Sequence, residues 1–69
     1  MKIYDMTTLG QAVRDRRKKY GYTQGYVSDV TGLSASFISD LENGKSTVEM
    51  GKAMHLIQML GMDILLEER

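Results

Sequence analysis

The sequence predicts an all-α fold of four short helices followed by a short C-terminal β-strand, and three observations support this. Apolar residues recur at intervals of three and four along most of the chain, which is the helical period. Glycine follows the four apolar segments, at Gly21, Gly32, Gly44 and Gly61, where a helix is expected to end. After the last glycine the apolar period changes to two, which is typical of a strand.

The first helix is expected from about Met6 to Lys19. Asp5 precedes it as a suitable N-cap, because a short acidic side chain can accept a hydrogen bond from the free N–H groups of a first turn. Tyr4 and Leu9 occupy the two positions of a hydrophobic staple around that cap. Leu9 and Val13 are expected to face the core.

Two shorter helices are expected next, roughly over residues 24–31 and 35–42. Thr23 and Ser34 are their N-caps, and Gly32 forms the turn between them. The apolar residues that can close the angle between the helices are Val27, Val30, Leu33, Ile38 and Leu41. This is the sequence form of a helix-turn-helix, a motif whose second helix lies in the major groove of DNA. A generic helical hairpin would show the same apolar spacing.

The fourth helix is expected to open at Ser46, because Glu49 follows three residues later at the spacing of a capping box. Gly61 is expected to end it. The residues of its apolar stripe are Met50, Ala53, Met54, Leu56, Ile57 and Leu60. Their spacing predicts a helix with one face toward the core.

Residues 62–67 alternate between apolar and polar side chains for most of their length and predict a strand. A lone strand needs a partner, because its edge presents unpaired N–H and C=O groups. The same strand of a second copy is the expected partner, which makes Met62, Ile64, Leu65 and Leu66 the dimerisation residues. Residues 2–4 could add a short flanking strand. A frayed continuation of the fourth helix is the alternative.

Length and composition indicate a single domain, residues 1–69, that needs help to be stable. A chain of this size buries only about 60% of its unfolded surface, and it has no Cys to form a disulfide, so oligomerisation is the remaining means. One His, no P-loop and a small core argue against an enzyme, a metal site or a cofactor. No apolar run approaches the ~20 residues of a membrane helix and no signal peptide opens the chain, so a cytoplasmic protein is expected.

Charge is unevenly distributed although the formal net charge is zero. Residues 1–20 carry six Lys or Arg against two Asp, whereas residues 21–69 carry three against seven Asp or Glu. The basic first part can supply salt-dependent attraction to DNA phosphates. A solvated helix face is the alternative.

The residues expected at a double-stranded DNA surface lie in the first turns of the two short helices, on the outer face of the second, and just beyond it. Helix N-termini present free N–H groups to phosphates, and Lys45 is placed for a phosphate contact. Gln24 can donate either to a phosphate or to a neighbouring side chain of the helix expected over residues 35–42. The full set is Thr23, Gln24, Ser34, Ala35, Ser36, Ser39 and Lys45.

The helix expected over residues 35–42 is poor in side chains that make strong contacts with bases. No Arg, Lys, Asn or Gln occurs between Ala35 and Glu42, so bidentate contacts with guanine or adenine are absent there. Ser36 and Ser39 can bond to several bases, whereas Asp40 repels phosphate and can accept only from cytosine. Specificity then comes from few contacts, from DNA shape or from elsewhere in the protein. Weakened DNA binding is the alternative.

Arg17 and Glu42 are expected to form an ion pair between the ends of the first and third helices. The alternative is that each faces solvent. His55 has no second His or Cys near it and is expected at the surface.

These offsets resemble the phage-repressor-like (XRE) helix-turn-helix family over about residues 9–61. The residues that carry the resemblance are Arg17, Gly21, Thr23-Gln24, Gly32-Leu33-Ser34, Ile38-Ser39 and Leu41-Glu42-Asn43-Gly44. The match is closer still to HipB-type antitoxins, where it extends to Ile3-Tyr4, to the segment from Leu56 to Leu60 and to the predicted strand. Arg16, at a usually apolar position, and Asp40, on the DNA-facing side, depart from the pattern.

The resemblance implies a homodimer whose C-terminal strands pair across the dimer axis. It also implies binding to a palindromic operator in the protein's own promoter region, and neutralisation of a HipA-type serine/threonine kinase toxin. A sequence-specific repressor and antitoxin, associated with the nucleoid when bound to its operator, is therefore expected. The alternatives are a stand-alone phage-type repressor and a module that holds a kinase without reading DNA.

Overall fold

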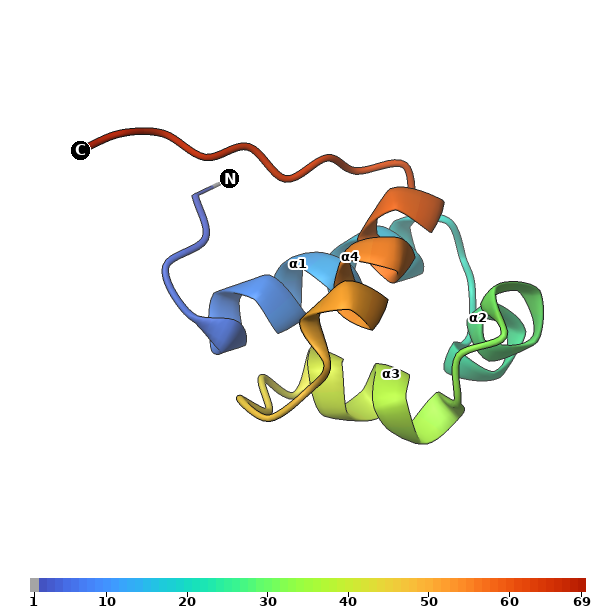
Figure 1. The fold of residues 1–69 in the computed structure, drawn as a ribbon. Coiled ribbons are helices and arrows are strands. Elements are labelled where there is room, and N and C mark those ends of the chain that lie inside the picture. The colour runs from blue at the N-terminus through green and yellow to red at the C-terminus, as the bar shows by residue number, and fades with distance from the viewer. Residues whose placement is uncertain (1) are drawn as a thin grey trace.

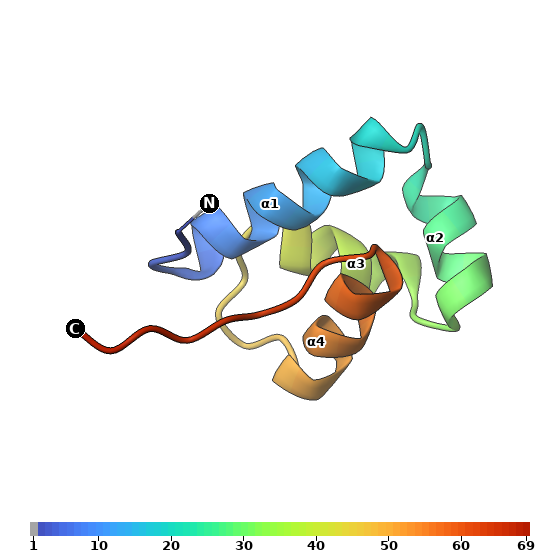
Figure 2. The ribbon, with the colours of Figure 1, turned by 90° about the horizontal axis from the view of Figure 1, so that it is seen from above.

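The computed structural model describes residues 2–69 and contains four helices within them (Figure 1). Their bounds are α1 Met6–Lys19, α2 Gln24–Thr31, α3 Ala35–Glu42 and α4 Met50–Met59. The long α1 packs against α3, and α2 packs against α3 at one end of the molecule (Figures 1 and 2). Ala53, Leu56 and Ile57 of α4 are buried in the same core. The all-α prediction is confirmed.

Three of the four helices begin where the sequence predicted, and α4 begins later. Its N-cap is Glu49, whose carboxylate accepts from the N–H groups of Gly51 at 3.0 Å and Lys52 at 2.8 Å. The expectation that Ser46 opens the helix is wrong. Glu49 reaches its own first turn and satisfies two free N–H groups there, so the residues before it form turns.

The start of α1 has a capping box formed by Asp5 and Thr8. Asp5 Oδ1 accepts from the Thr8 N–H at 2.8 Å, and Thr8 Oγ1 accepts from the N–H of Asp5 at 3.2 Å and from that of Tyr4 at 3.1 Å. The predicted hydrophobic staple is absent, because the Tyr4 side chain is 78% exposed. Met6 instead packs against the core beside Leu9.

The core lies between α1, α3 and α4 with a contribution from α2. Its buried apolar residues are Leu9, Val13, Val27, Ile38, Leu41, Ala53, Leu56, Ile57 and Leu60. Three residues predicted on core-facing stripes are exposed instead: Val30, Met50 and Met54. A short helix at the edge of a small fold buries only a narrow arc, so residues that flank the arc remain in solvent.

The C-terminal segment is extended but is not paired as a strand in the part of the chain that the structure describes. Gly61 ends α4 with a φ of 77°, which glycine adopts without strain. The segment then runs back toward the N-terminal end of α1 (Figures 1 and 2). Met62 packs partly on the core, whereas Leu65 and Leu66 are 84% and 94% exposed. A strand is defined by its ladder, and residues 2–4 do not provide one.

Candidate nucleic-acid interface

The turn between α2 and α3 is set by Gly32 and by hydrogen bonds around it. Gly32 has a φ of 76°, a left-handed conformation that strains other residues, and its N–H donates to Ser28 O. Ser28 Oγ donates to Leu33 O at 2.6 Å, which ties α2 to the residue that leads into α3. These contacts, together with buried Val27 and Ile38, determine the angle of the helix-turn-helix.

The predicted N-caps of α2 and α3 are present. Thr23 Oγ1 accepts from the N–H of Tyr26 at 3.0 Å, and Ser34 Oγ accepts from the N–H of Phe37 at 3.0 Å. Each cap satisfies the third N–H group of its helix and leaves the first two for an external acceptor. Both hydroxyl groups also retain a hydrogen to donate. The two helix starts can therefore hold anionic oxygens such as those of phosphate.

The outer face of α3 carries small side chains. Ala35 and Ser36 are exposed, while Ser39 and Asp40 are partly buried. Ser39 Oγ accepts from Asn43 Nδ2 at 3.4 Å, one turn along the helix. Since no bulky group covers this face, a DNA base edge can approach the α3 backbone closely.

Gln24 does not point away from the molecule. Its amide nitrogen donates to Glu42 Oε1 at 3.2 Å, so of the two roles expected from the sequence the structure contains the contact with a neighbouring side chain of α3. At the start of α2 the backbone N–H group of Gln24 has no intrahelical acceptor and is the part of this residue available to an external one.

A buried charge network ties α1 to α3 behind this surface. Arg17 Nε lies 2.7 Å from Glu42 Oε2, and Arg17 Nη2 donates to Glu42 Oε1 at 2.8 Å, so the pair is bidentate. Arg17 Nη1 donates to Tyr22 O at 2.8 Å. Both charged residues are only 8% exposed. Hydrogen bonding to Glu42 raises the pKa of Arg17, and the spacing gave no sign that the pair is buried or that Tyr22 joins it.

Gly10 brings the two helix backbones together beside this network. A Cβ atom at Gly10 would collide with Leu41 O and would lie 2.8 Å from Glu42 O. Only glycine therefore permits the distance at which α1 and α3 pack. This role could not be predicted from the sequence, because a glycine inside an amphipathic helix has no distinguishing local signal.

Arg16 has a structural partner that explains its unusual position. Its Nε donates to Leu60 O at 3.0 Å, and its guanidinium lies 5.0 Å from the centre of the Tyr20 ring. A cation that satisfies the last carbonyl groups of a helix stabilises its C-terminus. Arg16 therefore holds the end of α4 against α1.

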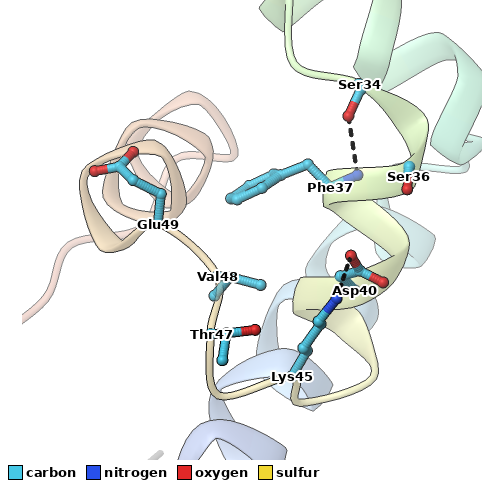
Figure 3. Close-up of a pocket in the computed structure, with 8 residues that line it drawn as sticks. All are labelled: Ser34, Ser36, Phe37, Asp40, Lys45, Thr47, Val48 and Glu49. Carbon is cyan, nitrogen blue, oxygen red and sulfur yellow. Dashed lines mark hydrogen bonds and ion pairs between the residues drawn. The ribbon is translucent and has the colours of Figure 1, made fainter.

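A groove of about 260 Å³ runs between α3 and the loop that follows it (Figure 3). It is lined by Ser34, Ser36, Phe37, Asp40, Lys45, Thr47, Val48 and Glu49. Lys45 Nζ lies 3.5 Å from Asp40 Oδ2 on the α3 side of the groove, and both side chains are roughly half exposed. Lys45, the basic residue among the predicted DNA-binding residues, therefore lies next to Asp40, the acidic residue on the outer face of α3.

The structure thus brings five of the seven predicted DNA-binding residues, Thr23, Ser34, Ala35, Ser36 and Lys45, to exposed positions; Ser39 is partly buried and Gln24 is engaged internally. Among residues 2–69 no group of His, Cys, Asp or Glu could hold a metal ion. No helix described is long and apolar enough to cross a bilayer.

Comparison with known proteins identifies the family to which this helix-turn-helix belongs. A Helix-turn-helix family model matches residues 13–65. The uncharacterized HTH-type transcriptional regulator y4mF of Sinorhizobium fredii (strain NBRC 101917 / NGR234) is 39% identical over 63 residues, which span 91% of this chain and 83% of that protein.

Among solved structures, a chain of a HipA-HipB-O2-O3 complex matches with a TM-score of 0.88 and 26% identity, covering 99% of this chain and 96% of that chain. A chain of a HipB-O4 20mer complex matches with the same TM-score of 0.88 and 26% identity, again covering 99% and 96%. The resemblance to the HipB fold predicted from the sequence is confirmed. The chain belongs to the helix-turn-helix family of XRE-type transcriptional regulators, which are DNA-binding proteins and not enzymes.

Proposed function

We propose that this regulator is a dimeric repressor that binds a palindromic operator in its own promoter region and neutralises a HipA-type serine/threonine kinase as its antitoxin. The observation that carries the proposal is the match to HipB structures over 99% of the chain, one of them a complex with HipA. The 39% identical transcriptional regulator supports the part of the proposal that concerns transcription regulation.

The DNA-binding surface in this proposal consists of the starts of α2 and α3, the outer face of α3 and Lys45. The N-capped helix starts contact phosphates, Ala35, Ser36 and Ser39 face base edges, and Lys45 contacts a phosphate beside the groove. Support comes from the free N–H groups of the first turns and from the small, uncovered side chains on α3.

The dimer in this proposal forms through the C-terminal segment, in which Ile64, Leu65 and Leu66 are exposed in one chain while Met62 is partly buried. Met62, Ile64, Leu65 and Leu66 would be covered when two segments pair as strands across a two-fold axis. The support is the exposure of Leu65 and Leu66 and the unpaired extended backbone of the segment. Truncation after Gly61 should shift the protein toward monomer in analytical ultracentrifugation, and an unchanged dimer would contradict this interface.

DNA binding is tested by titrating the purified protein into its own upstream DNA at ~150 mM salt, with a scrambled duplex as competitor. Lys45→Ala should weaken binding about equally across sequences and reduce the salt dependence by about one phosphate contact. Lys19→Ala is the matched control, since it removes the same charge from an exposed residue of α1 that does not line the groove. Equal effects of the two substitutions would show that Lys45 acts only through net charge.

The antitoxin role is tested by coexpressing the chain with a HipA-type kinase encoded beside it. Copurification and loss of kinase autophosphorylation are expected. Operator binding with no kinase-like neighbouring gene would instead indicate a stand-alone repressor.

A further inference from the structure

The outer face of α3 has one charged side chain, and it has the wrong sign for a DNA surface. Ala35, Ser36 and Ser39 carry no charge, while Glu42 is buried and paired with Arg17. The carboxylate of Asp40 is therefore the only one on this face of α3, and it lies where phosphates would approach. Such a placement costs binding energy unless the carboxylate makes a compensating contact.

Asp40 is positioned to make such a contact, because within the described residues its carboxylate makes one ion pair and no other contact of that kind. Among residues 2–69 that partner is Lys45, at 3.5 Å, and the Asp40 side chain remains 43% exposed. Asp40 follows Ser36 by one helical turn, so both lie at the edge of the groove (Figure 3). The carboxylate is thus an acceptor directed outward from α3, with a cation beside it.

An ionised carboxylate accepts hydrogen bonds and cannot donate them. In the major groove guanine presents the acceptors O6 and N7, thymine presents the acceptor O4, and adenine has an N7 acceptor next to its N6 donor. Each of these places a lone pair near the carboxylate. Cytosine presents its N4 amino donor without an acceptor of its own. We infer that Asp40 is the specificity-determining residue of this helix and selects cytosine at one position of each operator half-site.

Lys45 allows the protein to bind DNA tightly even though Asp40 is negatively charged. Its ammonium group lies beside Asp40 and offsets the charge of the carboxylate while the protein approaches the phosphates. In the complex Lys45 can contact the phosphate that flanks the cytosine, so the pair acts as one unit that both reads and anchors. This role of Asp40 rests on the proposed function, because it requires that the outer face of α3 meets DNA.

The test is selection from a randomised duplex library by the full-length wild type and by Asp40→Ala, Asp40→Asn and Asp29→Asn. The wild type should enrich a two-fold repeated site with one cytosine per half-site preferred by about tenfold. Asp40→Ala should lose the preference at that position alone, and Asp40→Asn should move it toward adenine, which Asn contacts through N6 and N7. Asp29→Asn removes the same charge from an exposed position on α2 and should retain the cytosine.

The outcomes separate the role of Asp40 from the function on which it rests. A wild type that enriches a site, with the same base preferences after Asp40→Ala, would overturn the reading by Asp40 and leave the repressor intact. A wild type that enriches no sequence would overturn the proposed function and the role of Asp40 together. Circular dichroism of each variant checks that α3 remains folded.

Discussion

The Arg17–Glu42 pair and the C-terminal segment place side chains in opposite kinds of unusual environment. Arg17 and Glu42 are charged yet only 8% exposed, whereas Leu65 and Leu66 are apolar yet 84% and 94% exposed. Every buried polar side-chain atom in the described residues has a hydrogen-bond partner, so the charged pair is satisfied within one chain. The apolar side chains of Leu65 and Leu66 in the C-terminal segment, by contrast, remain in solvent within one chain. The comparison separates contacts that one chain completes by itself from a surface that needs a partner.

The strongest test of this comparison removes half of the buried pair. Glu42→Ala leaves the guanidinium of Arg17 buried without its carboxylate and should lower the free energy of unfolding by about 3–5 kcal/mol. Urea denaturation at fixed protein concentration measures this. Replacing both partners, Arg17→Met with Glu42→Leu, should recover much of the loss because no charge is then stranded.

Asp40→Ala provides the matched control for that experiment. It breaks the half-exposed pair with Lys45 and should cost no more than about 1 kcal/mol. A loss from Glu42→Ala no larger than this would show that the buried pair contributes as little as a surface pair.

The second test probes the close approach of α1 and α3 that buries the pair. Gly10→Ala would force its Cβ against backbone atoms of Leu41 and Glu42 and should cost about 1–3 kcal/mol. Gly25→Ala is the control, since its Cβ would meet only Thr23 Oγ1 at 3.8 Å and should stabilise α2 by up to ~1 kcal/mol. The same sign for both substitutions in thermal unfolding would contradict the proposed steric role of Gly10.

The third test uses pH at the exposed cap of α1. The hydrogen bond from the Thr8 N–H to the Asp5 carboxylate lowers the pKa of Asp5 in the folded state. Because the folded pKa is depressed, the contribution of Asp5 to stability is present above its unfolded pKa and is lost as pH falls through the folded value. The stability difference between wild type and Asp5→Ala should therefore be constant near neutral pH and shrink in acid. Asp63→Ala, in the C-terminal segment, is the control.

The smallest effect on fold stability is expected in the C-terminal segment. Leu65→Asp with Leu66→Asp should change the helix content of one chain little, because both side chains are already in solvent. If the proposed dimer is correct, the same substitutions should raise the dissociation constant strongly in sedimentation velocity. Glu67→Ala with Glu68→Ala controls for a general effect of charge in the segment. A large loss of helicity at dilutions that give monomer would show that the helices of one chain depend on the C-terminal segment.

The sequence alone determined most of the local structure of this chain. The caps Asp5, Thr23 and Ser34 and the left-handed glycines place the ends of α1, α2 and α3, since a helix end is decided by hydrogen bonds within about four residues. The helix-turn-helix could be predicted for the same reason, whereas its family was implied by the resemblance of residues at fixed offsets to the XRE pattern. At α4 the sequence pattern predicted Ser46 as the start, whereas in the structure Glu49 is the N-cap.

Only the tertiary structure decided which residues meet across the molecule. Arg17 and Glu42 are 25 residues apart and Arg16 and Leu60 are 44 apart, so neither the burial of the first pair nor the contact of the second has a local signature. The inward direction of Gln24 and the groove beside Asp40 and Lys45 likewise depend on how α3 packs against its neighbours. Contacts between distant residues follow from packing, whereas helix ends follow from the chain's nearest hydrogen-bonding groups, and the candidate site is made of both.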